Sequence, residues 1–331
     1  MRALRFHRHG PPAEVLQLDD VPTPEPGPGQ VRVRLTHRAL NPADLSAVKG
    51  TYGALRDLPA IGGNEGMGTI DAVGEGVEGL APGQRVVKLG DGPTWVEAAI
   101  LDAADVLPVP EALSDEAAAQ LFVNPLTAHL LLDAAGLREG DVLAQSAGAS
   151  AVARIVTEMA VRRGVRVVSV VRRDAHADRL RQLGADVVVA DVVVADGNSR
   201  EARAALRAAV GEGGAAATLD PVAGETGALL LSALADRGTH IVYGALSGQP
   251  LPVSPRALIY RQSVVRGVWR SRWWKETPRE VSRPLLAQLA EAAAAGEFTL
   301  PVDATFDLAD GAEAVRYATA PGRWGKVLLT G

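Results

Sequence analysis

Hydrophobic and polar positions alternate in two different ways along this chain. In the first hundred residues, short apolar segments such as the alternating Val31–Leu35 lie between turn-forming stretches such as Pro22–Gly29 and Gly62–Gly63. Apolar residues at every second position, bounded by Gly and Pro, are typical of a β-meander or barrel. From Ser114, a predicted helix N-cap, the chain becomes rich in Ala and Leu at helical spacing. We therefore expect a domain boundary near residue 120.

Predicted strands and helices alternate between residues 121 and 266. Their spacing of about 20 to 30 residues is typical of a doubly wound parallel sheet, so this segment is predicted to be one Rossmann-type unit. Strands are predicted at 142–144, 165–171, 187–189, 218–220 and 241–243, with intervening helices that end near Arg163, Leu183, Val210 and Ala235.

Residues 267–331 are too few for a separate domain and are expected to return to the N-terminal one. They contain the Trp-rich stretch Trp269–Trp274, a predicted helix over 279–295 and a predicted strand over 325–330. Further upstream, the tandem repeat of 187–191 in 192–196 leaves the register of the third strand open by one repeat length, and we assign it no function.

Composition narrows the possible functions. The 331 residues, at about 150 per domain, indicate about two domains, and 47% hydrophobic residues suffice for two cores. Because the chain has no Cys, it can form no disulfide, thiolate metal site or cysteine nucleophile. A net charge of −5 gives no general attraction to nucleic acid or anionic lipid. Without a secretory signal or a long apolar run, the protein is expected to be cytoplasmic.

The first strand-to-helix turn of the Rossmann-type segment, Gln145–Ala153, is a candidate nucleotide site. It lacks the G-x-G-x-x-G spacing, and Gly148 is its only glycine, but residues 146–151 are all Gly, Ala or Ser. An ordinary tight turn would look the same. The second strand ends in Arg172 and Arg173 with no carboxylate directly after Val171, which favours NADP over NAD. The alternative is a solvated arginine pair before a helix.

Together these segments resemble the medium-chain dehydrogenase/reductase superfamily, and within it the zinc-free 2-enoyl thioester reductases. The resemblance spans nearly the whole chain. It rests on Asn41–Asp44, Lys49–Gly53, Gly62–Gly66, Pro82–Val86, Gly92–Trp95, Asn124–Ala128, Gln145–Arg154, Tyr243–Gly244 and Gly267–Trp269.

The resemblance implies an α/β fold in which a GroES-like β-rich catalytic domain (1–120 and 267–331) packs against a Rossmann NADP-binding domain (121–266), with the active site in the cleft between them. Zinc-binding members use a Cys and a His, but here Asn64 stands in the Gly-x-Glu segment and no Cys exists. The six histidines show no metal-ligand spacing, and His7 and His9 are read as strand surface. We therefore expect no metal.

Without a metal to polarise a carbonyl, we expect NADPH-dependent reduction of the C=C bond of an α,β-unsaturated thioester. The resemblance places the proton donor on Tyr52, and a phenol with an ordinary pKa of about 10 is protonated at neutral pH. Asn41 and Asn64 would orient Tyr52 or the substrate oxygen. The alternatives are a turn aromatic for Tyr52 and turn or cap roles for the two amides.

The resemblance also implies further contacts. The cofactor contacts are Asn124, Thr127, Ala149, Ser150, Ala151, Val152, Arg172, Arg173, Tyr243, Gly244, Ala245, Leu246, Trp269 and Lys326, and the substrate contacts are Trp95, Trp269 and Trp273. Five basic residues lie close together in the sequence: Arg266, Arg270, Arg272, Lys275 and Arg279. They could bind the phosphates of coenzyme A or the acidic surface of an acyl carrier protein, or they could be the solvated charges of an exposed helix.

Two other functions remain open. A quinone or 2-alkenal reductase would share the zinc-free architecture, and a relative that binds NADPH but has lost catalysis would fit the glycine-poor loop. A homodimer that pairs through the last Rossmann strand, near 262–268, is expected from the resemblance.

Overall fold

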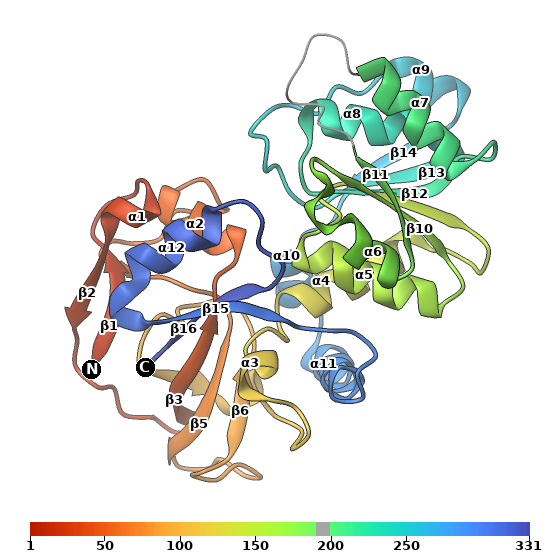
Figure 1. Ribbon diagram of the computed structural model, residues 1–331. Coiled ribbons are helices and arrows are strands. Elements are labelled where there is room, and N and C mark those ends of the chain that lie inside the picture. Colours follow the sequence, from red (N-terminus) through yellow and green to blue (C-terminus); the bar gives the residue numbers. More distant parts are fainter. Residues whose placement is uncertain (190–198) are drawn as a thin grey trace. The chain divides into compact units, whose positions relative to one another are not determined.

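The computed structural model describes residues 1–189 and 199–331 (Figure 1). The chain divides into two compact units. The first, here the β-rich unit, contains Met1–Leu126 and Ser271–Gly331, and the second, the Rossmann unit, contains Thr127–Arg270. The sequence predicts boundaries at 120/121 and 266/267, whereas the two units divide at 126/127 and 270/271.

The Rossmann unit is built on a six-stranded parallel sheet of order β11-β10-β9-β12-β13-β14. This order is that of a doubly wound dinucleotide-binding fold, so the predicted fold class is confirmed. The strands are β9 (Val142–Gln145), β10 (Arg166–Val171), β11 (Ala185–Val189), β12 (Ala215–Asp220), β13 (Leu234–Val242) and β14 (Val264–Gly267).

Helices cover both faces of this sheet (Figure 1). On one face, Val168 and Val170 of β10 pack with Leu206 of α7 and Leu229 of α8. On the other face, Gln145 donates hydrogen bonds to α5. None of the helices in the described residues is long and apolar enough to span a bilayer. The helices of this unit are α5 (Ala151–Arg162), α6 (Ala177–Gln182), α7 (Ser199–Val210), α8 (Gly224–Ser232) and α9 (Pro255–Tyr260), while α4 (Asn124–Ala135) begins in the β-rich unit.

Three sequence predictions need correction or a limit. The helix predicted to reach Ala235 ends at Ser232, because Leu234 already pairs with Ala215 in the sheet. His7 and His9 follow the first strand instead of lying on it. Of the tandem repeat, 187–189 lies in β11, while the second copy lies outside the described residues.

The β-rich unit contains a seven-stranded and a three-stranded sheet. Val31, Val33 and Leu35 are buried in alternation along the central strand β3, as the sequence pattern predicts. The strands are β1 (Arg2–Phe6), β2 (Leu16–Asp20), β3 (Gln30–Ala39), β4 (Ala60–Ile61), β5 (Gly66–Val73), β6 (Arg85–Lys88), β7 (Ala98–Asp102), β8 (Val106–Pro108), β15 (Val302–Asp307) and β16 (Lys326–Thr330), and the helices are α1 (Pro12–Val15), α2 (Pro42–Lys49), α3 (Asp115–Ala118), α10 (Arg270–Glu276), α11 (Arg279–Ala294) and α12 (Gly311–Thr319).

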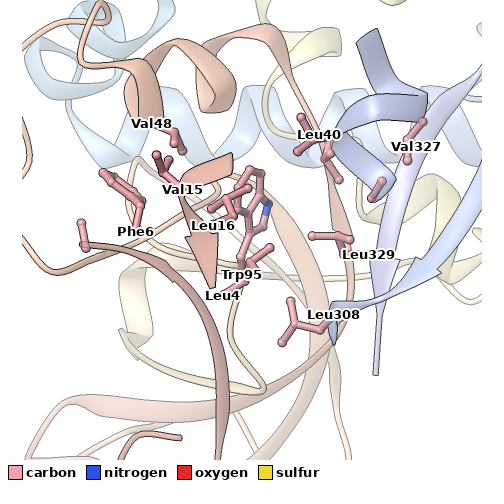
Figure 2. Close-up of a cluster of buried hydrophobic side chains, with 13 residues drawn as sticks. Leu4, Phe6, Val15, Leu16, Leu40, Val48, Trp95, Leu308, Val327 and Leu329 are labelled. Carbon is pink, nitrogen blue, oxygen red and sulfur yellow. The ribbon is translucent and has the colours of Figure 1, made fainter. Parts of the chain in front are cut away.

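Trp95 lies in the core of the β-rich unit, where it is fully buried with Leu4 and Phe6 of β1 (Figure 2). The backbone of Gly62 and Gly63 lies so close to the Trp95 ring that a Cβ at either glycine would be within 2.5 Å of a ring or Thr94 atom. These two glycines are therefore explained by packing. The prediction that Trp95 binds substrate is corrected, since its side chain belongs to the hydrophobic core.

Candidate active site

A tight loop of small residues joins β9 to α5. The Gly148 N–H donates to the Val170 carbonyl at 3.1 Å, and a Cβ at Gly148 would lie 2.6 Å from that of Ser169. No larger residue fits there, which explains the single glycine. The Ser150 hydroxyl caps α5 by accepting the Ala153 N–H at 3.3 Å. A loop without bulky side chains, followed by the free N–H groups of a helix, suits the phosphates of a dinucleotide.

Arg172 and Arg173 directly follow β10, and both are exposed. In sheets of this order, the ribose of a dinucleotide lies at the carboxyl end of the second strand. Two guanidinium groups at that position suit a 2′-phosphate, because they offer several donors and a positive charge. The residues present therefore fit NADPH better than NADH.

Asp220, the last residue of β12, contacts the β9–α5 loop, the loop that follows β12 and the strand β13. Its buried carboxylate accepts the Ser146 hydroxyl at 2.8 Å and the Val222 and Ala223 N–H groups at 2.9 and 3.1 Å, and it lies 3.6 Å from Nε2 of His240. Burial alone would raise the pKa of Asp220, but the nearby His240 imidazole and the hydrogen bonds from Val222, Ser146 and Ala223 together lower it. Asp220 is thus an ionised carboxylate whose hydrogen bonds hold the adjacent loops at the carboxyl edge of the sheet.

The predicted cofactor residues Tyr243–Leu246 follow β13 beside the Asp220 loop. The Tyr243 N–H donates to the Asp220 carbonyl at 3.0 Å, and burial raises the pKa of the Tyr243 hydroxyl. A Cβ at Gly244 would lie 2.7 Å from the Pro221 carbonyl oxygen, so glycine allows this close approach. Leu246 is 59% exposed, and Ala245 is exposed as well. The segment therefore presents small or exposed residues at the edge where the small-residue loop lies.

A buried polar cluster in the β-rich unit brings four predicted site residues together. The Asn41 Nδ2 donates to Glu65 at 2.6 Å, while its Oδ1 accepts hydrogen bonds from Asn124 and Lys326. Asn64 donates to Asp44 at 2.5 Å. All six side chains are nearly or fully buried: Asn41, Asp44, Asn64, Glu65, Asn124 and Lys326.

The buried Asp44 carboxyl group lies among three charged side chains, those of Glu65, Lys326 and Arg56. Burial raises the pKa of Asp44 to about 7, and the charge of Glu65 adds to that effect. The Asn41 N–H, which donates to Asp44 at 2.7 Å, and the two cations oppose it. Asp44 is therefore a carboxyl group that titrates near neutral pH.

Tyr52 lies in the loop between α2 and β4, where its side chain is half-buried. Its hydroxyl lies 3.5 Å from the Ser271 hydroxyl, at the long limit of a hydrogen bond. Ser271 belongs to the same unit but is distant in sequence. The contact between the two hydroxyls could not be foreseen from local spacing.

The tryptophans differ in exposure. Trp269 is 48% exposed after β14, Trp273 is half-buried in α10, and Trp274 is buried against Phe122, with ring centres 5.0 Å apart. The guanidinium carbon of Arg279 lies 3.9 Å from the Trp274 ring centre. These geometries leave Trp269 and Trp273 as the candidates for substrate contact.

The basic group predicted around these tryptophans is partly neutralised. Arg272 pairs with Glu276 at 2.8 Å, and Arg279 pairs with Asp105 at 3.0 Å. Arg270 is buried, with 7% of its surface exposed. Neither predicted alternative, an anion-binding patch or a helix face of solvated charges, therefore includes all five residues: Arg270 is buried, whereas Arg266, Arg272 and Lys275 are exposed.

Sequence reasoning missed several residues of these clusters. Asp44 and Glu65 were noted only as parts of the motifs that contain Asn41 and Asn64, and Asp220 only as a strand end. Ser271 and Arg56 gave no signal, because their contacts depend on tertiary packing. Within residues 1–189 and 199–331, no group of three His, Asp or Glu side chains could hold a metal ion.

Comparison with known proteins agrees with this architecture. Residues 27–111 match the alcohol dehydrogenase GroES-like domain, and residues 151–290 match the family described as zinc-binding dehydrogenase. The mitochondrial enoyl-[acyl-carrier-protein] reductase of Bos taurus is 33% identical, over 100% of this chain and 88% of the relative. That of Homo sapiens is 32% identical with the same coverage.

Solved structures are similar over the whole chain. A mycobacterial quinone oxidoreductase has a TM-score of 0.84, and a mycobacterial protein complexed with NADPH has a TM-score of 0.89. Each is 30% identical, and the match covers 100% of both chains. Fold and site thus define a two-domain oxidoreductase of the dehydrogenase type. The chain belongs to the zinc-independent branch of the medium-chain dehydrogenase/reductase superfamily, near the enoyl reductases.

Proposed function

We propose that this protein reduces the C=C bond of a 2-enoyl thioester with NADPH, and that Tyr52 supplies the proton. One observation supports the proposal above others: the Tyr52 phenol lies beside a second hydroxyl, that of Ser271, in a chain without any Cys ligand for a catalytic metal. Relatives that match the chain along its full length are named enoyl-[acyl-carrier-protein] reductases.

NADPH is the cofactor of this enzyme. The related mycobacterial structure contains NADPH, and Arg172 and Arg173 stand at the position that suits its extra phosphate. When bound, NADPH supplies the hydride that adds to Cβ of the thioester. The loop Ser146–Ala151 and the α5 N-terminus would bind its pyrophosphate, and Tyr243–Leu246 would line the same edge of the sheet.

The chain's own chemistry concerns the proton. As charge gathers on the thioester oxygen, the Tyr52 O–H breaks and its proton bonds to Cα, which leaves a phenolate that solvent reprotonates. The Ser271 hydroxyl donates to that phenolate oxygen while the charge is present. The side-chain amides of Asn41 and Asn64 form hydrogen bonds within the buried cluster, so we assign them a supporting role in the β-rich unit and not a direct contact with the substrate.

The thioester carrier is coenzyme A or an acyl carrier protein. Both present phosphate or carboxylate groups, which suit an exposed cation such as Arg266 of the Rossmann unit or Lys275 of the β-rich unit. The proposed location is the cytoplasm, to be tested by cell fractionation.

A quinone reductase is the second candidate, because a similar structure bears that name. Steady-state assays with crotonyl-coenzyme A and with a quinone, each with NADPH and with NADH, separate the functions. We expect the highest kcat/KM for the thioester with NADPH. A higher kcat/KM for the quinone would favour the second candidate, and tight NADPH binding without turnover of either would favour an inactive relative.

A further inference from the structure

The loop that contains Tyr52 has few points of attachment. Among residues 51–59, only Tyr52 and Arg56 are half-buried, and all the others are exposed. Leu55 and Leu58 are 67% and 42% exposed, so they do not fix the loop by apolar packing. Hydrogen bonds attach the two ends of the loop, from Thr51 to the Ser46 carbonyl and from Arg5 to the Pro59 carbonyl. Between these ends, the conformation of the loop depends on what Tyr52 and Arg56 contact.

Arg56 binds the loop to the segment that follows β4. Its guanidinium donates to the Ile61 carbonyl at 2.8 Å, to Oδ1 of Asn64 at 3.1 Å and to the Gly63 carbonyl at 3.4 Å. Because the guanidinium group of Arg56 is planar and rigid, three acceptors fix the position of this side chain more closely than a single contact would. The middle of the loop is thus held by one residue.

The acceptor Asn64 is itself fixed from the opposite side. Its Nδ2 donates to Asp44 at 2.5 Å, and Asp44 also accepts the Asn41 N–H at the start of α2. Helix α2 directly precedes the Tyr52 loop, and Asn64 lies just beyond β4, which follows the loop. Hydrogen bonds from Arg56 to Asn64 and from Asn64 to Asp44 therefore connect the middle of the loop to the segments before and after it.

The structure assigns Arg56 as a positioning residue for Tyr52: its three hydrogen bonds hold the loop so that the Tyr52 hydroxyl stays beside Ser271. This inference rests on the proposed function, in which Tyr52 is the proton donor. Arg56 touches no reacting atom in this account. It acts through the loop, while the Tyr52 hydroxyl itself lies 3.5 Å from that of Ser271.

A double-mutant cycle tests the inference. Arg56→Gln removes the charge and part of the fork, and we expect kcat for the enoyl thioester to fall about 10- to 100-fold, because small misplacements of a reacting group have effects of that size. The KM for NADPH should change less than twofold, and Arg56→Lys should recover part of kcat. In a Tyr52→Phe background, Arg56→Gln should lower kcat no further. An equal loss in both backgrounds would overturn the assignment.

Arg283→Gln is the matched control. Arg283 lies in the same unit and donates to two backbone carbonyls, those of Ala104 and Val106, neither of which belongs to the Tyr52 loop. It should alter stability as Arg56→Gln does, without the specific loss of kcat. If Arg283→Gln lowers kcat equally, the effect of Arg56 is general destabilisation and the inference fails.

A spectroscopic measurement keeps the inference separate from the proposed function. The chain has only four tyrosines, so fluorotyrosine labelling gives four ¹⁹F signals, and Tyr52→Phe identifies the one from Tyr52. Arg56→Gln should shift or broaden that signal, while Arg283→Gln should leave it in place. This result does not need an active enzyme. An unchanged Tyr52 signal in Arg56→Gln would refute positioning even if thioester reduction is confirmed, and absent thioester reduction with a shifted signal would refute only the function.

Discussion

Tyr52 is the residue on which the chemistry depends most directly. Replacement by Phe removes the hydroxyl beside Ser271 and little else, since the ring remains. We expect kcat for the enoyl thioester to fall by about 10²-fold or more, the usual contribution of a general acid, with little change in the KM for NADPH. Steady-state kinetics would measure this. An unchanged kcat would assign the proton to water.

Arg172 and Arg173 should determine the choice between the two nicotinamides. Replacing both by Ala removes two exposed guanidinium groups at the end of β10 without disturbing buried packing. The Kd for NADPH should rise far more than the Kd for NADH, because only NADPH has the 2′-phosphate. Fluorescence titration with each nucleotide would show it. An equal loss for both would reject the role of these arginines.

At the scale of elements, the buried cluster around Asp44 predicts a pH dependence of stability. The pKa of Asp44 is about 7 in the folded protein and lower, near its ordinary 3.8, when unfolded. Between about pH 4 and pH 7 the folded state therefore retains a proton that the unfolded state releases, so this group makes the protein less stable as pH rises through that window. Above pH 7 both states are ionised and its contribution stays constant.

Urea unfolding of the natural protein and of Asp44→Asn at pH 5 and pH 8 measures the effect. From pH 5 to pH 8 the natural protein should lose free energy of unfolding relative to the variant. The pKa of Asp220 is lowered in the folded protein, so its effect on stability changes only at more acidic pH and does not contribute between pH 5 and pH 8. Free energies of unfolding that change in parallel for the two proteins would contradict the titration of Asp44.

The elements also show how far sequence patterns reach. Strict alternation in Val31–Leu35 predicted β3, because one face of that strand is buried, and the regular spacing of strands and helices predicted the parallel sheet of the Rossmann unit. The end of α8 was misplaced, since no Gly or Pro separates it from β13. Trp95 was misassigned because a core aromatic and a substrate aromatic look alike in sequence. The contact of Ser271 with Tyr52 and those of Arg56 could not be predicted from sequence for a different reason, because tertiary packing alone creates them.

At the scale of the whole molecule, the edge of the Rossmann sheet predicts self-association. The outer strand β14 has Val264 48% exposed, and the neighbouring α9 exposes Ile259 and Tyr260 at 66% and 73%. An open strand edge with apolar neighbours suits an antiparallel pairing with a second copy. We expect a dimer in sedimentation velocity, and Val265→Pro should yield monomers because proline removes an edge hydrogen-bond donor. A monomer of the natural protein at micromolar concentration would contradict this.

The most direct test of the proposed reaction is an isotope measurement in D₂O with crotonyl thioester and unlabelled NADPH. The account predicts a butyryl thioester with one deuterium, located at Cα, and one NADPH consumed for each thioester reduced, as mass spectrometry and NMR would show. Deuterium at Cβ, or unchanged thioester alongside rapid reduction of a quinone, would contradict it.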